Sequence, residues 1–430
     1  MFFENCKILT REKGNIAYLP YKKQLVELED KIVSKITNKE DLSEFNKKLE
    51  NLSDVKFEFC DEVKSLTLML ATKCNLKCTY CYADEGTYGE SEELMDEITA
   101  INSVKKILSQ HPSVELIRFF GGEPLLNFKV LKKVCEYVEN YFSNKNIKFA
   151  VGTNGTILDG KIINLLKKYD IKVLISLDGP KELHDSNRID KQGLGSHSKI
   201  LKNLEMLKAE DIQFSLQCTY TKQHQKIKLH DLSSYLKQFT STIAIAPCRL
   251  PTGVVEIKDE FDNFTRSLES LFTDQPVFLA DVMHHISSIL YKNNINHFCD
   301  ANRRIVVFPN GDVYPCELLK FEKFYMGNVN RNDFDISGYK NIQEILSTFN
   351  RKDRLEDYWF KYLIPSICIS NHINDAIQKD SKIKLTEKVV NLNDMYFTHV
   401  LIRLYKAKTN NEWDTLIENI KYYNKMIDLK

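Results

Sequence analysis

From about residue 65 onward, short apolar strands alternate with amphipathic helices, and this alternation constrains the fold more than any other feature of the 430-residue chain. Such an order favours a parallel sheet whose strands are joined by helical crossovers. Apolar residues recur at helical spacing over 128–142, for example. Six strand–helix units predict a partial (β/α)6 barrel, although a doubly wound sheet would give a similar order of elements. The strands are expected near 65–71, 115–121, 148–154, 172–178, 213–220 and 242–248.

Two of these strands carry polar residues on one face. Because side chains alternate along a strand, Ser176 and Asp178 share a face of the fourth strand, and Gln217 and Thr219 share a face of the fifth. The carboxyl ends of barrel strands are where α/β enzymes place their chemistry. A polar lumen is therefore expected at that end.

The flanking segments predict smaller units. Strands at 6–10 and 15–19 around a Gly14-Asn15 turn should precede two amphipathic helices, the first carrying the apolar stripe from Leu25 to Ile36. Farther on, an Asn310-Gly311 pair predicts a hairpin. The expected division is a small N-terminal α+β unit at 1–60, the barrel at 61–275, a C-terminal extension at 276–380 and a helical segment at 381–430.

Composition excludes several classes of protein. With Lys+Arg 60 against Asp+Glu 59, the formal charge of +1 favours neither nucleic acid nor an anionic membrane surface. No run of 18 apolar residues predicts a membrane span, and the N-terminus lacks the apolar core of a secretory signal, so a cytoplasmic protein is expected. Eleven cysteines then indicate metal ligation or catalysis more than disulfides.

Cys74, Cys78 and Cys81 form a CxxxCxxC array directly after the first barrel strand. Three thiolates within eight residues can hold one 4Fe–4S cluster from a single loop and leave one iron without a side-chain ligand. That open iron can chelate a substrate. A structural zinc site, which usually adds a fourth nearby ligand, or three incidental core cysteines are the alternative interpretations.

This loop resembles the cluster-binding motif of radical S-adenosylmethionine (radical SAM) enzymes, including the aromatic Tyr80 before the third cysteine. The resemblance implies that S-adenosylmethionine binds the open iron through its amino and carboxylate groups. It also implies reductive cleavage to a 5′-deoxyadenosyl radical, which abstracts hydrogen from a substrate.

Later strand ends extend the resemblance. Gly121-Gly122-Glu123-Pro124 is similar to the family's GGEP motif, which holds the amino group of S-adenosylmethionine. Asn154 and Ser176 would lie near the ribose or methionine part, with Asp178 toward the substrate. Arg188 ends an HDxxR element and would pair with the carboxylate of S-adenosylmethionine. Ordinary turn and surface roles are the alternatives for these residues.

A second cysteine group flanks the predicted hairpin. Cys299, Gly311 and Cys316 resemble the opening of the SPASM or twitch extension of peptide-modifying radical SAM enzymes. The chain departs from the full pattern because residues 317–430 contain only Cys368, so two all-cysteine auxiliary clusters are impossible. One auxiliary iron–sulfur cluster held by Cys299, Cys316 and Cys368 is expected, with Cys248 among the candidates for a fourth ligand; loss of this cluster is the alternative.

The resemblance implies a peptide maturase that crosslinks or epimerises a ribosomally made precursor peptide, with the 1–60 unit as a candidate leader-binding module. The expected partners are that precursor and an electron donor such as flavodoxin or ferredoxin. A sulfatase-type maturase that oxidises Cys or Ser is the alternative enzyme; Glu317 matches an acidic position proposed there to take a proton. A non-catalytic iron–sulfur sensor is the alternative from another class.

Overall fold

Six parallel strands in sequence order make up most of the eight-stranded main sheet of the described residues. The computed structural model describes residues 6–11, 14–20, 22–38, 40–50, 62–248, 257–290, 299–336, 339–350, 355, 358–364, 385 and 387–427. The chain divides into two compact units, which are considered separately below. Unit 1 comprises residues 1–60, 281–299 and 346–417, and unit 2 comprises residues 61–280, 300–345 and 418–430.

The sheet of unit 2 runs in the order β11-β10-β4-β5-β6-β7-β8-β9. The strands β4 to β9 are all parallel to their neighbours, β10 is parallel to β4, and β11 turns back antiparallel to β10. Because β9 does not pair with β11, the barrel is partial. The strand bounds are β4 Ser65–Ala71, β5 Leu116–Gly121, β6 Lys148–Thr153, β7 Lys172–Ser176, β8 Phe214–Tyr220, β9 Ile243–Pro247, β10 Arg304–Val307 and β11 Val313–Tyr314.

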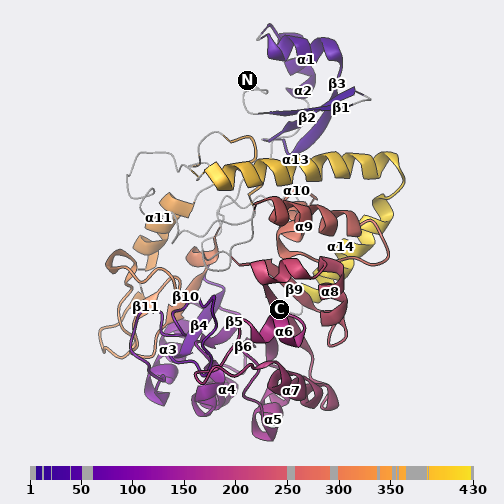
Figure 1. Ribbon diagram of the computed structural model, residues 1–430. Coiled ribbons are helices and arrows are strands. Elements are labelled where there is room, and N and C mark those ends of the chain that lie inside the picture. Colours follow the sequence, from indigo (N-terminus) through magenta and orange to yellow (C-terminus); the bar gives the residue numbers. More distant parts are fainter. Residues whose placement is uncertain are drawn as a thin grey trace. The chain divides into compact units, whose positions relative to one another are not determined.

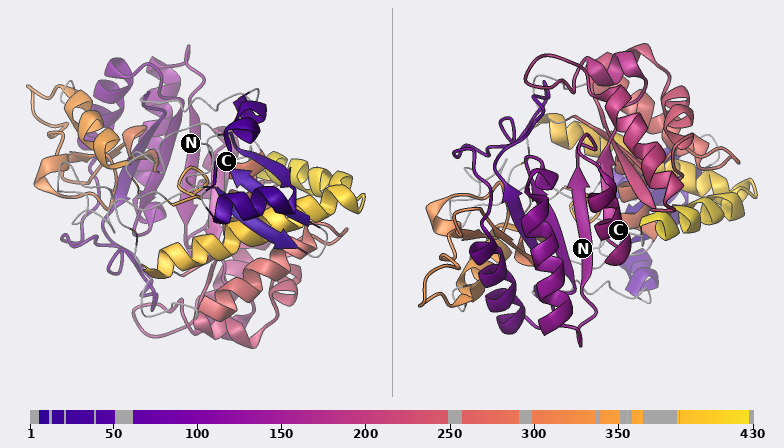
Figure 2. Two further views of the ribbon diagram at one scale, coloured as in Figure 1. Left: turned by 90° about the horizontal axis from the view of Figure 1, so that it is seen from above. Right: turned by 90° about the horizontal axis from the view of Figure 1, so that it is seen from below.

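Helices join these strands and cover the outer face of the sheet (Figures 1 and 2). Carboxylates fix two of the helix starts, since Asp96 accepts from the Thr99 amide and Asp159 from the Ile162 amide. The helices of unit 2 are α3 Glu97–Gln110, α4 Phe128–Tyr141, α5 Gly160–Lys168, α6 Lys181–Asp185, α7 His197–Ala209, α8 Leu229–Lys237, α9 Ile257–Ser270 and α11 Tyr339–Asn350, the last of which reaches into unit 1.

Strand alternation places the core outside the sheet and polar groups inside it, as expected. Phe214, Leu216 and Cys218 on β8 are buried, whereas Gln217 between them is exposed and Thr219 is half-buried. The same alternation on β7 buries its β-branched residues under the helices. The partial barrel and its six strands are therefore confirmed, each within two residues of the expected bounds.

Unit 1 contains a three-stranded antiparallel sheet of β1 Lys7–Arg11, β2 Gly14–Leu19 and β3 Gln24–Leu28, with β2 in the middle. Its helices are α1 Asp30–Thr37, α2 Ser43–Glu50, α10 Ala280–Leu290 and α13 Glu387–Thr409. The helix α14 Trp413–Ile427 begins in unit 1 and ends in unit 2. None of the helices within the described residues has the length and apolarity needed to cross a membrane.

Two details of the N-terminal expectation are wrong. Residues 24–28, expected to begin a helix, form β3, because they pair with β2 along its length from Asn15↔Leu28 to Leu19↔Gln24. The expected Gly14-Asn15 turn lies inside β2, since Arg11 pairs with Gly14. Apolar residues at 25, 26 and 28 fit either period, so sheet pairing decided the outcome.

Candidate functional site

The cysteine loop after β4 lines one wall of a cavity of about 320 Å³ at the carboxyl ends of the barrel strands. Its backbone pairs with the segment after α6, because the Lys77 amide donates to the Ile189 carbonyl at 2.7 Å and the Thr79 amide to the Asn187 carbonyl at 2.9 Å. This pairing holds the loop against the barrel. Cys74, Cys78 and Cys81 all line the cavity, together with Tyr80.

Gly121 and Gly122 let the end of β5 approach the cysteine loop closely. A Cβ at Gly122 would lie 2.4 Å from the carbonyl oxygen of Lys73, and one at Gly121, whose φ is +139°, would lie 2.2 Å from that of Ala71. Two backbone hydrogen bonds also join β5 to the loop: the Gly122 amide donates to the Ala71 carbonyl at 2.8 Å, and the Glu123 amide donates to the Lys73 carbonyl at 2.9 Å. The glycines are therefore required by backbone packing, in addition to any contact with a ligand.

Glu123 is fully buried and does not line the cavity. Its carboxylate accepts hydrogen bonds from the Thr153 hydroxyl at 2.8 Å, the Asn154 amide at 2.7 Å and the Leu125 amide at 3.0 Å. Pro124, also buried, begins a 3-10 turn at Pro124–Asn127. The acidic residue of this motif thus ties β5 to the end of β6.

Burial raises the pKa of Glu123 from an ordinary 4.5 to about 7. Between these values the folded chain keeps a proton that the unfolded chain releases, so this group makes the fold less stable as pH rises through that window. The prediction is tested by urea unfolding of the cluster-free parent and of the cluster-free Glu123→Gln variant at several pH values. We expect the free energy of unfolding of the parent, minus that of the variant, to fall from pH 5 to pH 7 by roughly 1 kcal/mol per pH unit.

The comparison with Glu123→Gln is needed because the buried histidines act in the opposite direction. Burial lowers the pKa of His184 to about 4, which makes the fold more stable as pH rises toward 6.5. Subtracting the two profiles removes this shared contribution. A difference that stays constant or grows with pH would contradict the assignment of a neutral buried Glu123.

Asn154 follows β6 and contacts the cysteine loop directly. Its side-chain amide donates to the Asn75 oxygen at 2.9 Å and lies 3.7 Å from the Cys74 sulfur. Its oxygen accepts from the amide and hydroxyl of Thr156. Asn154 lines the cavity as expected, and it also supports the loop that carries the first cysteine.

A buried hydrogen-bonded group next to the cysteine loop consists of Asp178, Arg188 and Tyr80. The Arg188 guanidinium donates to the Asp178 carboxylate through Nε at 2.9 Å and through a terminal nitrogen at 3.2 Å, and the Tyr80 hydroxyl donates to the same carboxylate. The Arg188 guanidinium carbon also lies 5.3 Å from the centre of the Tyr80 ring. Arg188 and Ser176 line the cavity, whereas the Asp178 side chain has no exposure and is not among the lining residues.

Burial favours the protonated thiols of Cys74 and Cys78. It raises the pKa of Cys74 to about 12 and raises that of Cys78, whereas the nearby Arg188 acts to lower the Cys78 value. Such thiols bind iron by exchanging a proton for the metal. Three thiols, a guanidinium and polar strand ends around one cavity of ligand size match the donors needed for a 4Fe–4S cluster and S-adenosylmethionine.

Several cavity residues were not among the expected site residues. Gln217 and Thr219 line it, and the alternation on β8 had already placed them together on its polar face. Cys248 was expected only as a possible ligand of the auxiliary cluster. No local sequence signal indicated Tyr82 and Tyr88, whose hydroxyls lie 3.4 Å apart. These further lining residues are Tyr82, Tyr88 and Cys248.

The second cysteine group is only partly described. Cys316 follows β11, and its sulfur lies 2.7 Å from a terminal nitrogen of Arg304, which also pairs with Glu317 at 3.0 Å. Cys299 belongs to unit 1 and Cys316 to unit 2, while Cys368 lies outside the described residues. A shared site for these three cysteines remains a prediction.

Comparison with known protein families matches two regions of the chain. The Radical SAM superfamily matches residues 68–222, and the SPASM iron–sulfur cluster-binding domain matches residues 299–357. The first region contains the cysteine loop, the glycine motif and Arg188. The second contains the β10–β11 hairpin and Cys316.

The similarity to two curated relatives extends over most of the length of each relative. The chain is 31% identical over 274 residues to "Uncharacterized protein MJ0907" of Methanocaldococcus jannaschii, covering 63% of this chain and 90% of that protein. It is 26% identical over 316 residues to a "Cysteine-type anaerobic sulfatase-maturating enzyme" of Clostridium perfringens, covering 67% and 84%.

Two solved structures share the fold. The structure of anSMEcpe with bound AdoMet has a TM-score of 0.67 at 22% identity and covers 84% of this chain and 99% of that one. Streptococcus suis SuiB bound to precursor peptide SuiA has a TM-score of 0.52 at 15% identity, covering 90% and 98%.

Proposed function

Because this chain belongs to the radical SAM superfamily and carries a SPASM domain, we propose that it abstracts hydrogen from a ribosomally made precursor peptide and leaves a crosslinked or epimerised residue. The observation that carries the proposal is the cavity in which the thiols of Cys74, Cys78 and Cys81 meet Arg188 and the polar ends of β6 to β8. The enzyme class rests on the family match, whereas the peptide product is the proposed part.

The residues around the cavity would divide the binding of the two cofactors. The three cysteines would hold the 4Fe–4S cluster, and Arg188 would pair with the carboxylate of S-adenosylmethionine. Ser176, Gln217 and Thr219 would offer hydrogen bonds to its polar groups. When bound, the reduced cluster and S-adenosylmethionine supply the radical that removes a hydrogen atom.

A peptide substrate is supported by the relatives and by unit 1. SuiB binds a precursor peptide, and another curated relative is the "Radical SAM cyclopropyl synthase TigE" of Paramaledivibacter caminithermalis, 25% identical over 317 residues. In unit 1, β1 and β3 are the outer strands of the described three-stranded sheet. An extended leader peptide can add as a further strand to such an edge, so we propose residues 1–60 as the leader-binding module.

The experiment that tests the proposal is turnover after anaerobic reconstitution with iron and sulfide. With a reductant, the protein should release 5′-deoxyadenosine from S-adenosylmethionine, and candidate short peptides encoded beside its gene should change. A crosslink removes hydrogen and lowers peptide mass, whereas epimerisation keeps the mass and changes the configuration. A loaded cluster without cleavage would instead support a non-catalytic iron–sulfur sensor.

Cys316→Ala is expected to separate the two halves of the reaction. If Cys316 binds the auxiliary cluster, the variant should still release 5′-deoxyadenosine without coupling. It should form at least about tenfold less peptide product, since even the loss of a residue that supports a metal ligand typically costs ~10–100-fold. The measurement is the ratio of modified peptide to 5′-deoxyadenosine. Cys135→Ala, which removes a buried thiol on α4, is the matched control. An unchanged ratio in Cys316→Ala would show that Cys316 has no role in coupling.

Oxidation of a substrate Cys or Ser to formylglycine is the second candidate function. The observation that favours it is the position of Glu317, whose carboxylate is mostly buried and is held by Arg304 beside the Cys316 sulfur. A carboxylate there can accept the proton that such an oxidation releases. With a cysteine peptide, this two-electron oxidation would take the aldehyde oxygen from water and release the sulfur as sulfide, with one hydrogen atom going to the radical from S-adenosylmethionine and the second electron to an iron–sulfur cluster. Mass spectrometry distinguishes this product from a crosslink. Either activity needs a one-electron donor, for which we propose a flavodoxin or ferredoxin.

A further inference from the structure

The peptide unit of Asp178 is followed by a glycine in a backbone conformation that few other residues adopt. Asp178 comes two residues after the end of β7 and precedes Gly179, whose φ is +130°. A glycine there permits many orientations of the preceding residue. Asp178 nevertheless must present its carboxylate to Arg188 and Tyr80 at once, so other contacts have to fix its main chain.

Two buried histidines bind the main chain of Asp178, one at its amide and the other at its carbonyl. Nδ1 of His184 accepts a hydrogen bond from the Asp178 amide at 3.2 Å, and Nε2 of His224 lies 2.7 Å from the Asp178 carbonyl oxygen. His184 comes from the short helix α6, and His224 from the turn after β8. The Cys218 thiol also donates to this carbonyl at 3.4 Å.

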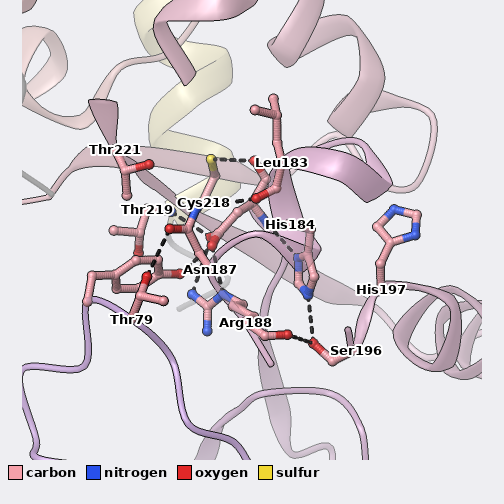
Figure 3. Close-up of polar contacts among 12 residues, drawn as sticks. Thr79, Leu183, His184, Asn187, Arg188, Ser196, His197, Cys218, Thr219 and Thr221 are labelled. Carbon is pink, nitrogen blue, oxygen red and sulfur yellow. Dashed lines mark hydrogen bonds and ion pairs between the residues drawn. The ribbon is translucent and has the colours of Figure 1, made fainter. Parts of the chain in front are cut away.

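Both histidines must be neutral, because in each ring Nδ1 accepts a hydrogen bond from a backbone amide and a protonated imidazole has no acceptor. Nδ1 of His184 accepts from an amide, so its proton is on Nε2, which donates to the Ser196 hydroxyl at 2.9 Å. That hydroxyl in turn donates to the Arg188 carbonyl at 2.8 Å (Figure 3). Nδ1 of His224 accepts from the Thr221 amide at 3.0 Å, so its Nε2 carries the proton that the Asp178 carbonyl accepts. Burial lowers the pKa of both rings and keeps them in this form.

His184 therefore links the main chains of both members of the ion pair. It binds the amide of Asp178 directly and the carbonyl of Arg188 through Ser196. The guanidinium held in this way lines the same cavity as Cys78, beside that residue, and lies 5.3 Å from the ring centre of Tyr80, one of the two residues between Cys78 and Cys81. Hydrogen bonds and charges near cysteine sulfurs are among the factors that set the reduction potential of an iron–sulfur cluster.

We propose that His184 and His224 are positioning residues which clamp the Asp178 main chain, so that the Asp178 carboxylate holds Arg188 against Cys78 and thereby raises the reduction potential of the cluster. The inference rests on the proposed cluster site. A cation beside a ligand sulfur favours the reduced cluster, because reduction adds negative charge. If the clamp is released, Arg188 is no longer held at that sulfur and the potential falls.

The test compares pairs of variants that differ in the clamp contact. His184→Leu and His224→Leu remove it. His184→Asn keeps an acceptor near the position of Nδ1, and His224→Gln keeps a donor near that of Nε2. His285→Leu, at a histidine of similar burial on α10 in unit 1, controls for the loss of any buried ring.

The readouts are the midpoint potential and electron paramagnetic resonance spectrum of the reconstituted cluster, and the rate of S-adenosylmethionine cleavage without peptide. We expect both leucine variants to shift the potential to more negative values and to slow cleavage by ~10–100-fold. The conservative variants should restore the potential, and His285→Leu should keep the parent value.

Two results would overturn the inference: leucine variants that load iron fully and keep the parent potential, or conservative variants that shift as far as the leucine ones. If the leucine variants do not fold, His224→Gln and His224→Asn provide the comparison, since only glutamine reaches the Asp178 carbonyl; equal potentials in that pair would also overturn it. Absence of cleavage in the parent protein itself would contradict the proposed function instead.

Discussion

Replacing Cys74, Cys78 and Cys81 together with alanine is expected to reduce release of 5′-deoxyadenosine to below detection. The three thiols are the protein ligands that the cavity offers on the cysteine loop, and alanine supplies no donor in their place. Without them, no cluster remains to pass an electron to S-adenosylmethionine. The measurements are iron and sulfide per chain and nucleoside release under anaerobic reduction.

The control for this experiment removes thiols elsewhere. Cys6→Ala combined with Cys135→Ala takes away one cysteine of unit 1 and one of the helix α4. That variant should keep the iron of the primary site and the parent rate of cleavage. If the triple variant still released the nucleoside at the parent rate, the assignment of the primary cluster to this loop would be wrong.

Gly122→Ala is expected to have a large effect for a single methyl addition, because the methyl enters the contact between β5 and the cysteine loop. The new Cβ would lie 2.4 Å from the Lys73 carbonyl oxygen and 3.0 Å from the Cys74 amide nitrogen, and both are backbone atoms that a side-chain rotation cannot move. The strand end and the cysteine loop must therefore separate. Overpacking of this kind costs ~1–3 kcal/mol, and here it also displaces the first cysteine. We expect lower stability of the cluster-free chain and faster loss of iron from the reconstituted protein.

Gly160→Ala provides the matched control for that prediction. Gly160 begins α5, and a Cβ added there meets no atom within 4 Å. Since alanine favours a helix more than glycine does, the control should be neutral or slightly stabilising. Equal iron retention in Gly122→Ala and Gly160→Ala would show that the loop tolerates the displacement.

The buried pair of Asp178 and Arg188 illustrates how a polar core can serve a binding site. A fully buried ion pair contributes little net stability compared with apolar residues, but removing one partner leaves an unpaired charge and costs ~3–5 kcal/mol. In this chain the Asp178 carboxylate also accepts from the Thr219 amide at 3.0 Å, so it connects β7, β8 and the cysteine loop. Because the Asp178 side chain has no exposure and its carboxylate accepts from Arg188, Tyr80 and Thr219, we propose that it positions these groups.

Short-range pattern was sufficient to predict the partial barrel and to propose Cys74, Cys78 and Cys81 as the ligands of a cluster. Strand alternation has a period of two residues and helix stripes a period of 3.6, so both can be recognised within a dozen residues. The cysteine loop is equally local, because Cys74, Cys78 and Cys81 lie within eight positions. Even the polar face of Gln217 and Thr219 could be predicted, since it depends only on alternation along β8.

Only the tertiary structure decided what the charged residues of the site contact. Glu123 lies in the motif that is expected to hold an ammonium group, and its carboxylate accepts hydrogen bonds from Thr153 and Asn154, thirty or more positions away. Tyr80 and Asp178 meet across 98 positions, and β3 formed where the apolar spacing fitted a helix equally well. The physical reason is that a buried polar group takes whichever partner the packed strands bring within hydrogen-bonding distance. Local spacing records which residues share a face of one element, but the distance between residues on different elements exists only once the sheet has formed.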